Sequence, residues 1–200
     1  MGDLKFLESL TSSFENLPGV GRKTAKRYAY HVLEKLTEDQ VISFAETLID
    51  TKRKVKNCPI CGMLSLDSPC EICTSENRDR SKIMVVKDTK DIVAIDSMGE
   101  YNGMYHSLGG LLSPIDGIGP SSLNISLLEK RLNNEVEEVI IATSFTPSGE
   151  MTALYLEKIL SKDNLIVSRL GYGIPAGGDI ENVDDLTFKR AFSNRTNNIK

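Results

Sequence analysis

Four cysteines arranged as two C-x₂-C pairs constrain the fold of this 200-residue chain more than any other feature. Cys58 and Cys61 form the first pair, Cys70 and Cys73 form the second, and eight residues separate the two pairs. Two such turns can place four thiolates around one tetrahedral zinc ion. Paired disulfides and a redox-active C-x₂-C are the alternatives, but cytoplasmic thiols stay reduced and no thioredoxin-like pattern surrounds the pairs. We therefore predict one structural zinc ion per chain, because four protein ligands leave no open position for catalysis.

The region before the cysteines has the periodicity of amphipathic helices. One helix is expected over residues 3–15 and a second from about Arg22, and Pro18 and Gly19 interrupt the pattern between them. The second helix carries an apolar, inward-facing stripe: Ala25, Ala29, Val32, Leu33 and Leu36. Thr37 and Gln40 have the spacing of a capping box that opens a third helix. The apolar stripe of that third helix is Val41, Phe44, Ala45, Leu48 and Ile49.

The connection LPGVGRKTAKR, residues 17–27, combines glycines with a cationic helix start. Gly19 and Gly21 would let a phosphate approach the backbone, and the unpaired amides of a helix N-terminus attract phosphate. Four cations follow on the face away from the apolar stripe: Arg22, Lys23, Lys26 and Arg27. The alternative is a plain glycine turn with solvated cations. The pattern is that of a helix-hairpin-helix, and we predict that it binds the DNA backbone without reading bases.

Charge and hydropathy limit the class of protein. The formal net charge is −4, yet residues 19–31 and 52–56 are cationic, while acids gather at 135–138 and 179–185. Local charge, rather than net charge, makes a binding surface, so an anionic partner is expected for the N-terminal region. The chain has no run of about 18 apolar residues and its N-terminus lacks the apolar core of a signal peptide. We expect a cytoplasmic protein without a membrane span.

The second half of the chain alternates between two kinds of segment, which indicates an α/β fold with a mostly parallel sheet and flanking helices. The short β-branched runs lie at residues 82–86, 138–143 and 164–170. The helical stretches lie near residues 89–98, 121–132 and 149–160. A Gly- and Pro-rich loop at residues 109–120 is expected on the surface.

With these features in order, nearly the whole chain resembles the RecR family of recombination mediators. The distinctive stretches are LPGVGRKTAKR, the four-cysteine segment, YHSLGGLLSPIDGIGP, EVIIAT…GEMTALY and RLGYGIPAGGDIE. The resemblance implies a helix-hairpin-helix region over residues 1–56, a zinc motif over 57–78, a Toprim α/β domain over 79–175 and a C-terminal segment over 176–200 that makes oligomer contacts. Family members form rings that can encircle DNA. They act with RecO, and in many cases RecF, to load RecA on single-stranded DNA, which implies an adaptor rather than an enzyme.

The chain departs from catalytic Toprim domains in its acidic residues. Lys87 ends the first strand where those enzymes have a glutamate, Thr143-Ser144-Phe145 replaces the acidic DxD cluster, and Ser148 replaces an acid common in RecR relatives. Glu150 remains, and we predict that it attracts a basic partner such as RecO. The alternative function is a magnesium-dependent nuclease or primase, for which Asp88, Asp91 and Glu150 are the available carboxylates. For His31 and His106 we expect ordinary packing or surface positions.

Overall fold

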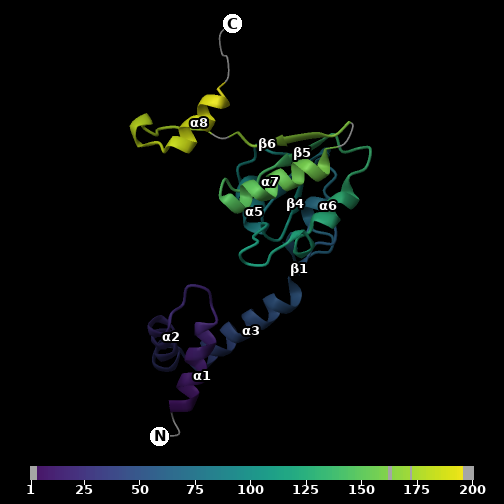
Figure 1. Cartoon of the computed structure of the whole chain (residues 1–200). Coiled ribbons are helices and arrows are strands. Elements are labelled where there is room, and N and C mark those ends of the chain that lie inside the picture. Colours follow the sequence, from purple (N-terminus) through teal and green to yellow (C-terminus); the bar gives the residue numbers. More distant parts are fainter. Residues whose placement is uncertain (1–3, 162–163, 172, 196–200) are drawn as a thin grey trace. The chain divides into compact units, whose positions relative to one another are not determined.

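The computed structural model describes residues 4–161, 164–171 and 173–195 (Figure 1). The chain divides into two compact units, with the boundary between Val55 and Lys56. Within the described residues, every helix is too short or too polar to cross a membrane.

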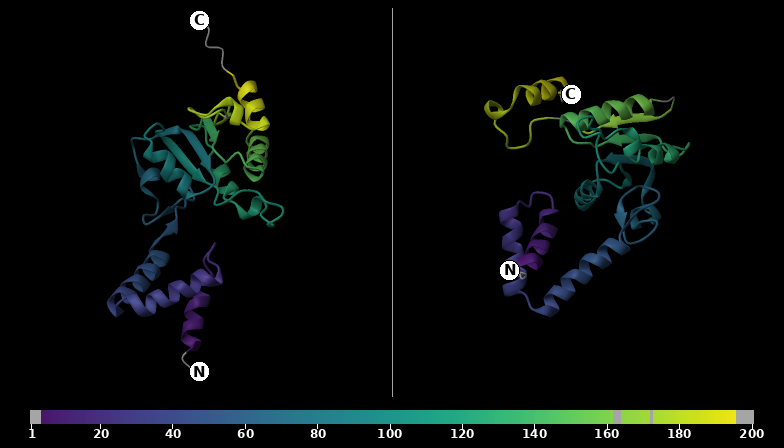
Figure 2. Two further views of the ribbon diagram at one scale, coloured as in Figure 1. Left: turned by 90° about the vertical axis from the view of Figure 1, so that its left-hand side faces the viewer. Right: turned by 60° about the horizontal axis from the view of Figure 1, so that its bottom comes forward.

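The first unit consists of three helices, as the sequence predicts. They are α1 (Leu4–Glu15), α2 (Arg22–Lys35) and α3 (Glu38–Lys54). Helices α1 and α2 lie side by side (Figure 2). Between them, Phe14 packs edge-on against Tyr28 with 5.7 Å between ring centroids. The capping box is present at the start of α3, where the Thr37 side chain accepts from the Gln40 amide and the Gln40 side chain accepts from the Thr37 amide.

The apolar stripes of the first unit are buried only in part. Ala25 and Ala29 are fully buried in α2, as predicted, but Leu33 is 61% exposed and no residue of α3 is buried. Phe44 and Leu48 of α3 are 51% and 57% exposed. A single short helix pair covers too little area to bury the face of a 17-residue helix that extends away from it (Figure 1). The expected inward stripe of α2 is therefore wrong at Leu33, whereas Val32 and Leu36 are partly buried, and the stripe of α3 is exposed from Phe44 onward.

The second unit contains a four-stranded parallel sheet in the order β4-β3-β5-β6. Its strands are β3 (Asp79–Val86), β4 (Gly103–Ser107), β5 (Glu138–Ile141) and β6 (Ile166–Arg169). The register places Val85 of β3 between His106 of β4 and Ile141 of β5. The predicted parallel α/β fold is confirmed, although the sequence analysis missed β4.

Helices pack on both faces of this sheet, because successive side chains of a strand point to opposite faces. Ile83 and Val85 of β3 join the core beneath α6 (Ile125–Arg131) and α7 (Pro147–Leu160). Met84 and Val86 join a second core with α5 (Thr89–Ser97). All three helices lie in the expected segments, but a 3₁₀ turn at Pro120–Ser122 precedes α6, which begins only at Ile125.

Two smaller parts complete the second unit. The cysteine segment contains a two-stranded antiparallel ladder, β1 (Lys56–Asn57) and β2 (Leu64–Ser65), and the short helix α4 (Glu71–Thr74). The C-terminal segment contains a 3₁₀ turn, Ile180–Asn182, and helix α8 (Asp185–Ser193), which the sequence analysis did not predict.

Candidate functional site

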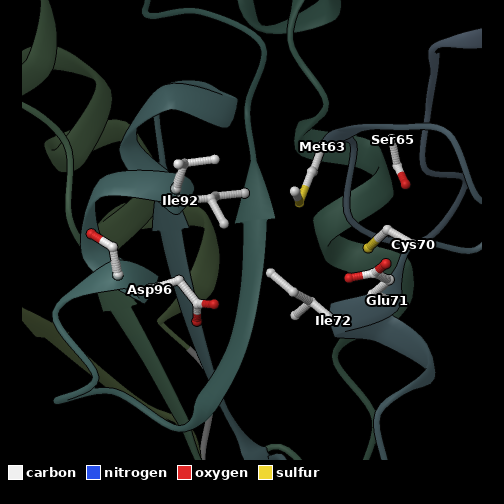
Figure 3. A pocket seen from close by; sticks show the side chains of 9 residues that line it. Met63, Ser65, Cys70, Glu71, Ile72, Ile92 and Asp96 are labelled. Atoms are coloured by element: carbon white, nitrogen blue, oxygen red, sulfur yellow. The ribbon is translucent and has the colours of Figure 1, made fainter.

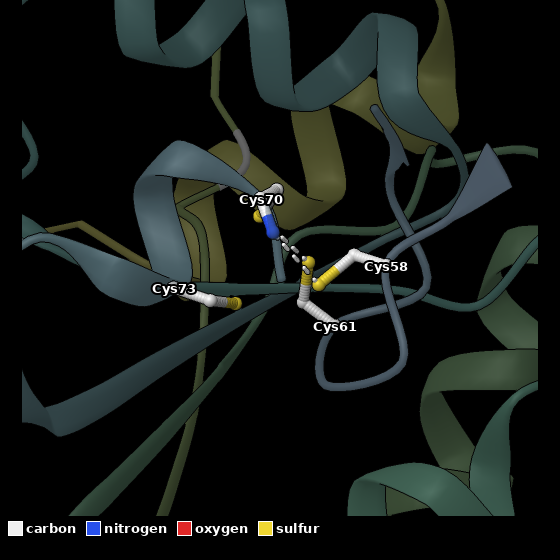
Figure 4. Close-up of side chains that lie close together, drawn as sticks. All are labelled: Cys58, Cys61, Cys70 and Cys73. Atoms are coloured by element: carbon white, nitrogen blue, oxygen red, sulfur yellow. Dashed lines mark hydrogen bonds between the residues drawn. The ribbon is translucent and has the colours of Figure 1, made fainter. Parts of the chain in front are cut away.

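The four cysteines come together in one buried cluster (Figure 4). Their sulfur atoms all lie within 4.8 Å of one another, and each residue is at most 4% exposed. The Sγ atoms of Cys61 and Cys70 are 3.6 Å apart, and the Cys70 amide lies 3.4 Å from the Sγ of Cys58. The cysteines are free thiols rather than disulfides. The predicted four-cysteine metal site is confirmed as an arrangement that can bind one metal ion.

Local turns aim the thiols inward. The Cys58 amide donates to the Met63 carbonyl (2.7 Å) and the Gly62 amide donates to the Cys58 carbonyl (2.9 Å). These bonds close the turn of the first C-x₂-C pair, here called the first knuckle; the turn of the second pair is the second knuckle. The Thr74 amide donates to the Cys70 carbonyl (3.1 Å), which closes the second. A side chain at Gly62 would collide with the Asn124 side chain and the Ser107 carbonyl, so glycine lets the first knuckle press against the end of β4.

The electrostatics of the cluster favour a bound cation. Hydrogen bonding from Cys73 lowers the pKa of Cys61 to about 5, while burial raises the pKa of Cys70 to about 11. The hydrogen bond to Cys61 and burial both raise the pKa of Cys73. The cluster therefore favours the thiolate of Cys61 and disfavours those of Cys70 and Cys73, and four buried thiolates need a cation to compensate their charge. Thiolate ligands select soft or borderline metal ions.

The cysteine segment also contributes to the core of the second unit. Met63 and Ile72 are partly buried and pack against both core clusters of the sheet. Between them and Ile92 of α5 lies a hollow of about 330 Å³, bordered by Glu71 and Asp96 (Figure 3). The Leu64 amide next to this hollow donates to Thr89 Oγ1 at 2.9 Å. The knuckles are thus packed onto the sheet rather than attached as a separate appendage.

The turn between α1 and α2 presents its two glycines differently. Gly19 has a φ of +78°, in the left-handed region that favours glycine. Gly21 is the N-cap of α2 with an ordinary φ of −80°, and a Cβ added there would meet open space. The fold therefore requires glycine at position 19 but not at position 21. A missing side chain at Gly21 instead leaves the first amides of α2 open to a ligand.

The predicted cationic face follows this turn on exposed positions of α2. Arg22 forms ion pairs with two acids of α1: its guanidinium lies 3.3 Å from the Glu15 carboxylate and 3.8 Å from that of Glu8. Lys23, Lys26 and Arg27 form no ion pair with any described residue. The structure thus groups the predicted phosphate-binding residues and distinguishes three unpaired cations from one paired cation.

At the carboxyl edge of the sheet, the remaining acids have structural partners. Asp88 is the N-cap of α5 and accepts from the Lys90 amide at 2.9 Å, and the Asp91 carboxylate accepts from the Asp88 amide at 3.4 Å. The Lys87 ammonium lies 3.8 Å from the Asp88 carboxylate. Both aspartates therefore serve as helix caps.

Glu150, in the first turn of α7, is paired with two arginines. Arg169 of β6 donates to both carboxylate oxygens at 2.9 and 2.7 Å, and Arg190 of α8 donates to Oε1 at 2.7 Å. The hydrogen bonds from Arg169 and then Arg190 lower the pKa of Glu150 to about 2. The sequence analysis missed both arginines, which lie 19 and 40 positions away along the chain. Its prediction that Glu150 attracts a basic partner stays a prediction.

Comparisons with known proteins agree with this architecture. The family model described as RecR, helix-hairpin-helix matches residues 7–51, the Toprim domain model matches 81–171, and the RecR C-terminal model matches 173–196. The Recombination protein RecR of Streptococcus thermophilus is 46% identical over 191 residues, which cover 95% of this chain and 96% of that protein. The chain belongs to the RecR family. A Staphylococcus aureus protein of the same name is 44% identical over the same shares of both chains. The predicted resemblance to the RecR family is confirmed.

Proposed function

We propose that the protein is a non-catalytic, DNA-binding mediator of recombinational DNA repair in the cytoplasm. In this proposal it acts with RecO, and with RecF where RecF takes part, to promote loading of RecA on single-stranded gaps. Membership of a family of recombination proteins supports the broad role. The observation that carries the DNA-binding part is the group of three unpaired cations directly behind Gly21, on the first turns of α2.

The proposed contact is to the sugar-phosphate backbone. A phosphate oxygen can accept from the first amides of α2, because Gly21 offers neither a side-chain cap nor a Cβ to keep it away. Lys23 and Arg27, four residues apart, share one side of the helix and can reach neighbouring phosphates. Such contacts position a protein on single- or double-stranded DNA without selecting a sequence.

We propose zinc as the metal held by the cysteine cluster, one ion per chain. Four buried sulfur ligands match the closed tetrahedral set that structural zinc sites use. With every position filled by protein, the ion would stabilise the knuckles and activate no water. Free thiols of this kind persist in a reducing compartment, in agreement with a cytoplasmic protein.

We further propose that the protein is a homo-oligomer, in the form of a ring. Two exposed apolar faces support self-association: Phe44, Leu48 and Ile49 on α3, and Leu186, Phe188 and Phe192 on α8. Exposed apolar patches of this kind mark interaction sites. Closed symmetry is the usual solution for soluble homo-oligomers, and it would concentrate the cations of α2 from several copies.

The state of the acidic residues supports a role without turnover. A magnesium ion would need one or two carboxylates, but Asp88 and Asp91 cap α5 and Glu150 binds Arg169 and Arg190. In the proposal Glu150 instead belongs to the docking surface for RecO. Replacing Glu150 with Gln should then weaken RecO binding while DNA binding stays unchanged.

The DNA-binding proposal is tested by affinity across a salt series. Lys23→Ala and Arg27→Ala should each weaken binding equally on unrelated sequences and lower the slope of log affinity against log salt by about 0.9 on duplex DNA. Lys35→Ala is the matched control, because it removes an exposed cation from the last turn of the same helix. Unchanged slopes in both variants, or a strong sequence preference, would refute a backbone contact at this site.

A further inference from the structure

A partly buried arginine lies beside the cysteine cluster. Arg131 is the last residue of α6, and its Nη1 donates to the Tyr105 carbonyl of β4 at 2.6 Å. Arg131 also lines a cavity of about 200 Å³ together with Ile60, which stands between Cys58 and Cys61. Arg131 and the first knuckle therefore border the same cavity.

The charge of Arg131 is not balanced by a carboxylate. No acidic side chain among the described residues lies within ion-pair distance of it. Burial lowers the pKa of Arg131, and the four cysteine side chains all act in the opposite direction. A buried cation is costly unless an anion compensates it. Glu135 lines the same cavity without forming an ion pair with Arg131, so the cysteine cluster is the anionic group that acts on the charge of Arg131.

The requirement is mutual once a metal is bound. A divalent ion with four thiolates leaves two negative charges in a buried site. Arg80 contributes at the second knuckle, where its Nη2 donates to the carbonyls of Cys73 and Ser75 at 3.3 and 3.2 Å, but Arg80 is solvent-exposed and its charge is screened. Arg131 is the more buried of the two and so acts in a lower dielectric.

A partly buried hydrogen-bond chain connects Arg131 to the backbone of Cys61. Its Nη1 lies 3.2 Å from His106 Nδ1, and His106 Nε2 lies 2.9 Å from the Asn124 carbonyl. Arginine can only donate and a carbonyl can only accept, so His106 is neutral and carries its proton on Nε2. The Asn124 side chain donates to the Ser107 carbonyl (3.0 Å), and the Ser107 amide donates to the Cys61 carbonyl (2.7 Å).

We propose that Arg131 is a positioning residue whose positive charge stabilises the four-thiolate, metal-bound state of the cysteine cluster. This proposal rests on metal binding by the four cysteines. Its consequence is that loss of the charge, rather than loss of packing, accelerates metal release. Groups that surround metal ligands typically change metal affinity by 10–100-fold when they are replaced.

The test measures zinc release from the full-length, zinc-loaded protein to a chromogenic chelator at pH 7.5. Arg131→Met keeps the length of the side chain without its charge, and should release zinc about tenfold faster than the unsubstituted protein. Lys130→Met is the matched control, because Lys130 is an exposed neighbour that lines the same cavity. Its release rate should stay within about twofold of the unsubstituted rate, since a solvated charge is screened.

Arg131→Lys separates charge from shape. It keeps the positive charge but loses the guanidinium fork, and should release zinc closer to the unsubstituted rate than Arg131→Met does. Release from Arg131→Lys as fast as from a folded Arg131→Met would overturn the proposal, as would unchanged release from Arg131→Met. If Arg131→Met does not fold, the comparison of Arg131→Lys with Lys130→Met decides the matter: release tenfold faster from Arg131→Lys counts against a role of charge. Unsubstituted protein that binds no zinc would instead refute the metal proposal itself, so the two failures are distinguishable.

Discussion

The two units of the molecule differ in how far they bury their apolar side chains. In the described part of the first unit, only Thr11, Ala25 and Ala29 are buried. The second unit has a core on each face of its sheet, with fully buried residues such as Leu128 and Leu156. The sheet buries its core within a single chain, whereas α3 of the first unit, like α8 of the C-terminal segment, leaves an apolar face exposed.

The two units therefore differ in how much of their apolar surface a single chain buries. The sheet unit combines a large core with a cysteine cluster that packs onto it through Met63 and Ile72. The helical unit has little core and instead presents three unpaired cations and an exposed apolar face. Changes in the core of the sheet should therefore act on folding, and changes at the exposed face of α2 or α3 on association with DNA or with further copies.

The largest expected effect comes from breaking the metal cluster. Cys73→Ser removes one of four ligands, and loss of a structural metal typically costs more than about 4 kcal/mol of unfolding free energy. Hydrogen exchange read by mass spectrometry should show loss of protection in β3 and β5, while α1 and α2 keep theirs. Chelation of the unsubstituted protein should give the same pattern. Loss of metal with unchanged protection of the sheet would contradict the packing described for the knuckles.

Next in size is a matched pair of leucine truncations. Leu156→Ala, in the core under α7, should cost about 2–5 kcal/mol of unfolding free energy. Leu48→Ala, on the exposed face of α3, should change the stability of the single chain by less than about 0.5 kcal/mol. Light scattering over a concentration series should show weaker self-association for Leu48→Ala alone. Equal destabilisation by both variants in dilute, monomeric protein would contradict the claim that Leu156 supports the core while Leu48 does not.

A third, smaller effect distinguishes the two glycines of the turn. Gly19→Ala should destabilise the helical unit by about 1–2 kcal/mol, because a Cβ is disfavoured at a positive φ. Gly21→Ser should retain or slightly raise stability, since serine is a good N-cap. The same serine would obstruct the first amides of α2, so DNA affinity should fall severalfold. The measurements are thermal unfolding and DNA titration of both variants; full DNA affinity in Gly21→Ser would contradict a phosphate contact at these amides.

The smallest effect concerns pH. Burial, followed by the charge of Arg131, lowers the pKa of His106 to about 4. The unfolded chain therefore takes up a proton first as the pH falls below about 6.5, and the contribution of His106 to stability is lost as the pH falls toward 4. Urea unfolding should show a loss of about 1 kcal/mol between pH 7.5 and 5.5 that is absent in His106→Gln. His31→Gln, which removes the exposed imidazole of α2, is the control and should keep that loss.

Much of this architecture could be predicted from local pattern alone. The C-x₂-C spacing identifies the metal ligands because each pair closes its own turn, and the capping box at Thr37 marks the start of α3 because both bonds are local. The strand β4 was missed since GMYHS contains no β-branched residue, although all five of its residues are buried in the sheet. Helix α8 did carry a usable signal, because Asp184 caps it and Phe188 and Phe192 recur at helical spacing.

The parts that escaped prediction depend on contacts between distant positions. Arg131 reaches β4 across 26 residues, and the Glu150 carboxylate meets donors 19 and 40 residues away. No periodicity or motif encodes such a pairing, because it follows from the order of strands in the sheet. The same reason explains why the stripe of α3 could be predicted but its exposure could not: a helical stripe indicates an apolar face but not what covers it.

The shared carboxylate of Glu150 has a consequence for any basic partner. Its two oxygens already accept three charged N–H groups, one of which comes from Arg190 of the C-terminal helix. A carboxylate has about four lone-pair sites, so one site remains on Oε2, and an incoming cation competes with Arg190 only at Oε1. Competition at Oε1 is reciprocal: the contact of Arg190 weakens binding of the second cation, and a bound second cation weakens the contact of Arg190 by the same free energy. Docking of a basic partner at Oε1, as proposed above, would therefore loosen the attachment of α8.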